Sequence, residues 1–297
     1  MMIERETFNI LVERAMTVGN RAHMRPVVER ELFHYDIRFA LDQANLLKHL
    51  TFQGGTSLRL CYGSPRFSED LDFSGGKSFS TAYLVSMKNC LEKYLGTRYG
   101  LDVSVKEPKE MLQLPEERDV KVDKWQLSIT TAPERRDLPK QKIKIEVINI
   151  PSYSRIPRPL LHNYDFLPDG YSDTLIMTET LDEIMADKLV SLVNCSRYVR
   201  HRDIWDLHWL VQRGAQINFV FVQNKINDYR ITDYLFKLNH FLENLDDIIK
   251  GKHFHDEMSR FIPLDVQERT LKKEIFLVFL ITEINDLLLE VKKMILS

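Results

Sequence analysis

Two aspartates separated by one residue, Asp70 and Asp72, are the side chains best placed to perform chemistry in this sequence. In an extended segment, residues i and i+2 point to the same face, so both carboxylates project together while Leu71 and Phe73 point towards a core. Neighbouring carboxylates repel each other, and a divalent cation relieves this repulsion. The pattern therefore predicts a Mg²⁺ site, with the solvated face of an edge strand as the plainer alternative.

A glycine turn precedes these acids. The segment 50–53 is apolar enough for a short strand, and Gly54 and Gly55 allow a tight turn at which a ligand can approach bare backbone. Thr56 and Ser57 then open a short helix whose first N–H groups are free to bind an anion. The four turn residues are thus predicted to cradle nucleotide phosphates. An ordinary turn is the alternative, because glycines mark turns in general.

The order of strand, Gly-Gly-Thr-Ser, short helix and Asp-x-Asp resembles the nucleotidyltransferase superfamily of polymerase-beta-like enzymes. Thr56 stands where that pattern usually has serine. The resemblance implies a third metal-binding carboxylate on a neighbouring strand. Glu146 is the best-placed acid downstream, because the segment 142–150 alternates between polar and apolar residues. The superfamily more commonly has aspartate at this position, and a solvated strand face is the alternative for Glu146.

A lysine on a predicted helix is a second candidate for chemistry. Thr180 is a suitable N-cap, with Glu183 in the capping-box position, for a helix that begins at Leu181 and ends near Cys195. Lys188 falls within or at the edge of the apolar stripe of this helix. Its amine could either reach solvent from a buried stem or hold a positive charge against a triphosphate.

Two further acids, Asp203 and Asp206, lie one turn apart on one side of the next predicted helix. The alternative is a structural role, in which these two acids interact favourably with the helix dipole and form salt bridges along the helix. Basic residues of the same region could form a patch for RNA phosphates or a solvated helix rim. They are Arg197, Arg200, Arg202, Arg213, Lys250 and Lys252.

Four separated blocks together resemble the AbiEii toxins of bacterial abortive-infection and type IV toxin–antitoxin systems, which also include the MenT toxins. The blocks are GGTSLRL, RFSEDLDF, MADKLVSLV and RHRDIWDLHWL, and they fall within residues 52–210. The resemblance implies a nucleotidyltransferase domain followed by a helical domain. It also implies a nucleoside triphosphate (NTP) as substrate, Mg²⁺ as cofactor and a cognate antitoxin as partner.

The resemblance extends to individual positions. It implies that Asp70 and Asp72 hold magnesium, that Lys188 contacts nucleotide phosphates, and that Asp203 is an acid required for activity, with Asp206 in support. The glycine turn matches the nucleotide-binding turn of the family. The prediction that Glu146 is the third metal ligand comes from the superfamily resemblance alone.

The hydrophobic periodicity predicts an α+β fold, with a mixed sheet flanked by helices and then a C-terminal helical bundle. Helices are expected over 3–18, 25–50, 81–95, 181–195, 218–229, 232–250 and 271–296, and strands over 50–53, 101–105, 125–131, 142–150 and 175–177. A Pro-rich segment, 151–173, marks a boundary. We therefore expect a nucleotidyltransferase domain over 1–174 and a helical domain over 175–297 that contributes Lys188 and Asp203 to the active site.

Composition narrows the class of protein. A chain of 297 residues with 44% hydrophobic residues can bury a full core. A formal net charge of −2 excludes a global basic field, so any nucleic-acid binding must come from a local patch. Three dispersed cysteines suit a reducing compartment, and no apolar run reaches the roughly 18 to 20 residues of a membrane span. We expect a cytoplasmic protein that does not associate with membranes.

Together these features predict transfer of a nucleoside monophosphate (NMP) from an NTP to an acceptor hydroxyl, with release of pyrophosphate and dependence on Mg²⁺. The family resemblance implies that the acceptor is the 3′ end of tRNA and that the modification blocks translation. Two alternatives stay open. One is a protein nucleotidylating (AMPylating) enzyme, and the other is a catalytically inactive module that binds a nucleotide or a partner.

Overall fold

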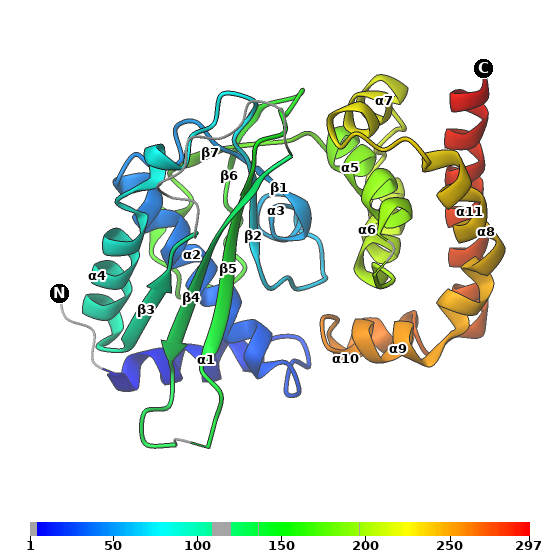
Figure 1. The fold of residues 1–297 in the computed structure, drawn as a ribbon. Coiled ribbons are helices and arrows are strands. Elements are labelled where there is room, and N and C mark those ends of the chain that lie inside the picture. Colours follow the sequence, from blue (N-terminus) through cyan, green and yellow to red (C-terminus); the bar gives the residue numbers. More distant parts are fainter. Residues whose placement is uncertain (1–4, 109–119, 136, 196) are drawn as a thin grey trace. The chain divides into compact units, whose positions relative to one another are not determined.

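The computed structural model describes residues 5–108, 120–135, 137–195 and 197–297. It divides the chain into two compact units, Met1–Thr178 and Glu179–Ser297 (Figure 1). The first unit holds a mixed sheet with helices, and the second is helical. The expected α+β fold class with a C-terminal helical region is therefore confirmed.

The sheet has seven strands in the order β3-β4-β5-β2-β1-β7-β6. The pairs β2–β5 and β1–β7 are parallel, and the other neighbours are antiparallel, so the sheet is mixed as predicted. The strands are β1 Thr51–Gln53, β2 Leu71–Ser74, β3 Asp102–Lys106, β4 Val122–Thr130, β5 Gln141–Ile148, β6 Ile156–Pro159 and β7 Leu175–Thr178. Because β7 pairs with β1 and β6, the first unit extends to Thr178, four residues beyond the expected division after 174.

One face of the sheet forms the core of the first unit. Alternate residues of the long strands β4 and β5 are buried, and the residues between them face the other way. Phe52 of β1 stacks on Phe73 of β2 with ring centroids 5.1 Å apart, and both are buried. This alternation confirms the prediction that Leu71 and Phe73 point towards the core and leaves the opposite face to polar side chains.

The helices α1 Arg5–Thr17, α2 Arg25–Gln43 and α4 Met87–Tyr99 pack together beside the sheet, and α3 Gly54–Tyr62 packs against β1 and β2 (Figure 1). The first residues predicted for α1 lie outside the described residues. The helix predicted to reach residue 50 ends at Gln43, because Asn45 adopts a left-handed conformation with φ 56°. The helix predicted from residue 81 begins instead as a short 3₁₀ turn, η1 Thr81–Leu84, and a second such turn, η2, spans Asp169–Tyr171.

The described residues of the second unit form a set of packed helices. They are α5 Leu181–Asn194, α6 His201–Gln212, α7 Phe219–Asp228, α8 Tyr234–Lys250, α9 Lys252–Ser259, α10 Leu264–Arg269 and α11 Glu274–Leu296. Helix α5 contacts α6, α7 and α8, and α11 packs on α8 and α6. The N-cap at Thr180 is confirmed, because its hydroxyl accepts the N–H of Glu183 at 3.4 Å. The short helices α9 and α10 were not predicted. None of the helices in the described ranges combines the length and the apolar character that crossing a membrane requires.

Candidate active site

Two of the predicted metal ligands, Asp72 and Glu146, belong to a row of register partners that runs across four adjacent strands. Lys124 of β4 is in register with Glu146 of β5, Glu146 with Asp72 of β2, and Asp72 with Gln53 of β1. Partners in register on adjacent strands project to the same face of a sheet, so Asp72 and Glu146 are neighbours there. Asp70 lies two residues before Asp72, where β2 begins, and both aspartates are half-buried. The fold thus brings the three predicted metal ligands to one region of the sheet.

Two lysines contact these acids. The Lys124 ammonium lies 2.7 Å from Glu146 Oε1. The Asp70 carboxylate accepts the backbone N–H of Lys144 at 3.1 Å and lies 3.5 Å from the Lys144 ammonium. The hydrogen bond to Glu146 raises the pKa of Lys124, and the negative charges of Glu146, Asp70 and Asp72 raise this pKa further. Three acids therefore act on one cation, which indicates a concentrated negative potential on this face.

The acid pair meets the requirements of a divalent cation. Carboxylate oxygens are the hard ligands that Mg²⁺ prefers, and it is usually held by one or two carboxylates together with water and substrate phosphates. Among the described residues, one group of three acids has carboxylate oxygens that all lie within 4.8 Å of one another, and it is on α5 and the residues before it. Asp70, Asp72 and Glu146 are therefore spaced more widely than that. The pair Asp70 and Asp72 fits such a site. Glu146 already contacts Lys124 through Oε1.

The glycine turn lies directly against Asp72. Helix α3 starts at Gly54, which has φ +75°, and a Cβ there would lie 2.9 Å from Asp72 Oδ2. A Cβ on Gly55 would overlap Nη2 of Arg66. Gly54 therefore requires glycine for its backbone conformation, and a side chain at Gly55 would displace the end of Arg66. The turn and the acid pair, which the sequence separates by a whole helix, adjoin each other in the fold.

The two hydroxyl residues of the turn are buried and engaged in hydrogen bonds. Thr56 Oγ1 donates to the backbone carbonyl of Asp70, and Ser57 Oγ lies 2.6 Å from the hydroxyl of Thr178. The hydroxyl of Thr56 therefore ties the start of α3 to the segment that carries the acids. Anion binding by this turn would come from the backbone N–H groups at the start of α3. This helix begins at Gly54, before Thr56 and Ser57, at which the sequence predicts that it opens.

The second set of predicted residues comes together within the helical unit. The Lys188 ammonium on α5 lies 2.6 Å from Asp203 Oδ1 and 3.0 Å from Asp206 Oδ2 on α6. Asp203 also accepts a hydrogen bond from Ser191 Oγ at 2.8 Å and forms an ion pair with Arg200. Lys188, Asp203 and Asp206 are all buried. The amine is thus held between two acids and does not extend to solvent.

The charges around Asp203 determine its protonation. Burial by itself would raise the pKa of this carboxyl group, because it disfavours the charged form. The positive charges of Lys188 and Arg200, and the hydrogen bonds from both side chains, outweigh burial and lower the pKa of Asp203 below its usual range. Asp203 therefore stays ionised and keeps a fixed negative partner beside the Lys188 ammonium.

The sequence matches the family model described as nucleotidyl transferase AbiEii toxin, type IV TA system, over residues 37–273. The match includes both sets of site residues. The chain belongs to the AbiEii family of nucleotidyltransferase toxins. This AbiEii protein is therefore a nucleotidyltransferase, and its type IV toxin–antitoxin family implies an NTP substrate and an antitoxin partner.

Two solved structures from Helicobacter pylori are similar to this AbiEii protein. One, a candidate nucleotidyltransferase, has 18% sequence identity and a TM-score of 0.48, and the match covers 89% of this chain and 96% of that chain. The other, JHP933, has 19% identity and a TM-score of 0.45, with 89% and 93% covered. No curated protein matches the sequence. The family model, and not these distant structures, identifies the chain.

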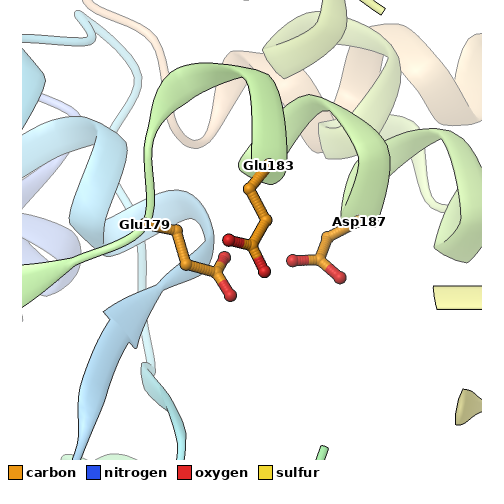
Figure 2. Close-up of side chains that lie close together, drawn as sticks. All are labelled: Glu179, Glu183 and Asp187. Atoms are coloured by element: carbon orange, nitrogen blue, oxygen red, sulfur yellow. The ribbon is translucent and has the colours of Figure 1, made fainter. Parts of the chain in front are cut away.

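The AbiEii chain also contains a buried acidic cluster that the sequence analysis missed. Glu179 precedes α5, Glu183 and Asp187 lie on its first turns, and the three carboxylates converge (Figure 2). They surround the ammonium of Lys225 on α7 at 3.3, 2.9 and 3.1 Å. The spacing of i, i+4 and i+8 was the available signal, because it places acids on one face of a helix.

Lys225 already supplies the cation of this cluster. Burial and the charge of Asp187 raise the pKa of Glu179 well above its usual value, and burial also raises the pKa of Asp187. The acids in turn raise the pKa of Lys225 despite its burial. Although the spacing of the oxygens would suit a metal ion, an ammonium occupies their centre. We therefore assign the cluster to the packing of α5 on α7.

The predicted basic patch in the helical unit is largely matched by acids. Arg200 pairs with Asp203, and Arg202 lies 3.3 Å from Glu257. Lys250 lies 2.9 Å from an acid one turn earlier on α8, and Lys252 lies 3.9 Å from an acid on α9. These contacts favour the solvated rim over an RNA-binding patch for these four residues.

Proposed function

We propose that this AbiEii protein transfers NMP from an NTP to the 3′ end of tRNA in a Mg²⁺-dependent reaction that blocks translation. The observation that carries the proposal is the position of Asp70 and Asp72 against the first turn of α3. The acids and a helix N-terminus form adjacent sites for a cation and for the phosphates that it accompanies.

In this proposal each group of the first unit has a separate task. Asp70 and Asp72 would hold Mg²⁺, which supplies positive charge to the phosphate oxygens when bound. The backbone N–H groups from Gly54 to Thr56, which precede the first intrahelical hydrogen bond of α3, would bind the β- and γ-phosphates and orient the triphosphate. Phosphoryl-type transfer depends mainly on such positioning and charge stabilisation, so the chain needs no covalent intermediate.

The helical unit would supply a further cation. Lys188 is proposed to contact the phosphates, with its amine held by Asp203 and Asp206 at 2.6 and 3.0 Å. A lysine held at a defined position provides a fixed point charge for the leaving group. Asp203 is then a positioning residue, and its lowered pKa preserves the charge that holds Lys188.

The charge of the sheet face favours RNA as the acceptor. Lys142 and Lys144 of β5 lie on the same face as Glu146, and Lys124 of β4 is in register with that acid. Lys142 is exposed, and the side chains of Lys124 and Lys144 are 49% and 43% exposed. Lys124 and Lys144 already pair with Glu146 and Asp70, so the exposed Lys142 is the lysine of this face that would contact the phosphates of an RNA acceptor.

Transfer of labelled nucleotide to total tRNA tests the proposal. Asp70→Asn should reduce labelling on the order of 100-fold or more, because it removes a metal-binding charge of the proposed site. Asp102→Asn is the matched control, since Asp102 is an exposed acid on the edge strand β3 of the same sheet. Labelling by Asp70→Asn at the wild-type rate would contradict the assignment.

The same assay separates the alternatives. Wild-type protein incubated with labelled NTP and either total RNA or total protein should label RNA. Labelling of protein alone would instead identify a protein nucleotidylating enzyme. In a growth assay, equal toxicity of wild type and Asp72→Ala would indicate a binding module without catalysis.

A further inference from the structure

A pocket of about 500 Å³ lies on the first unit and includes Thr51 and Ser74 in its lining. These two residues are in register on β1 and β2. Thr51 lies two residues before Gln53, and Ser74 lies two residues after Asp72 on the antiparallel partner strand. This pair therefore projects to the same face as Gln53 and Asp72, about 7 Å away. The pocket therefore adjoins the acid row, and its volume is in the range of small-molecule sites.

The lining of the pocket suits an anionic ligand. It includes Arg155 and His49, hydroxyl groups such as that of Ser78, and, among the described residues, no Asp or Glu. Arg155 is exposed, and within the described part of the chain no hydrogen bond or ion pair engages its guanidinium group. A guanidinium group matches the geometry of a phosphate, and an imidazole can add a hydrogen bond.

The pocket also offers an aromatic surface. Tyr83 is 55% exposed, and its ring centroid lies 5.7 Å from that of His49. Phe79, which is buried, forms part of the wall. Exposed aromatic rings stack on the bases of single-stranded nucleic acids with little sequence preference. A phosphate-binding arginine beside such a ring is the combination that one nucleotide requires.

The order of groups along the strands indicates which nucleotide binds here. Gly54 follows β1 and contacts Asp72 from one side, whereas Thr51 and Ser74 lie on the other side of the pairing of Gln53 and Asp72. The acids therefore separate the glycine turn from the pocket. In phosphoryl transfer the attacking and leaving oxygens are roughly in line. If the turn holds the leaving phosphates, the attacking hydroxyl arrives from the side of the pocket.

We propose that this pocket binds the terminal nucleotide of an RNA acceptor, with its phosphate on Arg155 and His49 and its base against Tyr83. The inference rests on the proposed function. The 3′ hydroxyl oxygen forms a bond to the α-phosphorus of the NTP while the bond between that phosphorus and the α–β bridging oxygen breaks. Pyrophosphate leaves, and the hydroxyl proton passes to water.

Kinetics with varied tRNA and varied NTP test the inference. Arg155→Ala and Tyr83→Ala alter exposed side chains, so the fold should be retained. Each should raise the KM for tRNA about tenfold or more, as loss of one charged or stacking contact does, and leave the KM for NTP within about twofold. Arg135→Ala is the matched control, because Arg135 is an exposed arginine of the same unit.

The outcomes separate the inference from the function on which it rests. If the wild type transfers nucleotide to RNA and both variants keep the wild-type KM for tRNA, the pocket assignment is wrong while the function stands. A rise in the KM for NTP alone would assign the pocket to the triphosphate and overturn the inference. If the wild type labels protein or nothing, the proposed function itself fails. Weaker binding of a labelled tRNA by Arg155→Ala in an Asp70→Asn background would support the inference without catalysis.

Discussion

At the scale of single residues, the protonation of Asp203 links the stability of the helical unit to its proposed function. The lysine and arginine beside it lower its pKa below the ordinary value of 3.8. The native state therefore binds fewer protons at this site than the unfolded chain. The resulting stability is fully present above about pH 4 and is lost as the pH falls through the lowered pKa.

Asp203→Asn should therefore destabilise the protein at pH 7 and less so in acid. The expected loss at pH 7 is about 3 kcal/mol in the free energy of unfolding, because one partner of a buried ion pair is removed. Urea unfolding at pH 7 and at pH 3 measures it. Asp265→Asn, which removes an exposed partner of Arg269, should cost at most about 1 kcal/mol. An equal loss at both pH values would show that Asp203 is not the titrating group.

At the scale of elements, the turn between β1 and α3 positions the acid pair. Gly54 has the left-handed backbone that the turn requires, and its Cα leaves room for the Asp72 carboxylate. Thr56 then bonds to the backbone of Asp70. The start of one helix thus contacts both acid-bearing residues, which is why we propose that the turn and the acids act as one site.

Gly54→Ala should impair both stability and transfer. An alanine in this conformation costs about 1–2 kcal/mol, and its Cβ would push the Asp72 carboxylate aside. Gly214→Ala is the matched control, because Gly214 has φ +79° and a methyl group added there would meet nothing within 4 Å. Both variants should lose similar stability in urea unfolding, and only Gly54→Ala should lose nucleotide transfer. Full transfer by Gly54→Ala would separate the turn from the site.

At the scale of the whole molecule, the proposed chemistry draws on both compact units. The first unit carries Asp70 and Asp72, and the second carries Lys188 with its two acids. Each unit buries its own apolar core, so each set of side chains is held by independent packing. In the proposal the two sets therefore have separable roles, Asp70 and Asp72 towards the metal and Lys188 towards the substrate phosphates.

Lys188→Ala and Asp72→Asn should differ in their effects on metal binding. Lys188→Ala is expected to reduce transfer on the order of 100-fold or more while Mg²⁺ affinity stays within about twofold of the wild type. Asp72→Asn should weaken both, because it removes a metal-binding charge. Calorimetric titration with Mg²⁺ alone, together with the tRNA labelling assay, distinguishes them. Loss of Mg²⁺ binding in Lys188→Ala would contradict the division of roles.

The sequence by itself determined what depends on neighbouring residues. Alternation around Asp70 and Asp72 predicted which side chains enter the core, and the cap at Thr180 predicted where α5 begins. The four sequence blocks predicted the family. These features were accessible because strand alternation and helix capping are properties of a few consecutive residues.

Only the tertiary structure decided which distant residues became neighbours. Glu146 lies beside Asp72 because β5 pairs in parallel with β2, and Lys124 reaches Glu146 because β4 is the next strand. Lys225 enters the acidic cluster from another helix, and Arg155, which is distant in the sequence, lines the pocket beside Ser74. Such contacts follow from how whole elements pack, and the periodicity of one segment contains no information about which segment will lie against it.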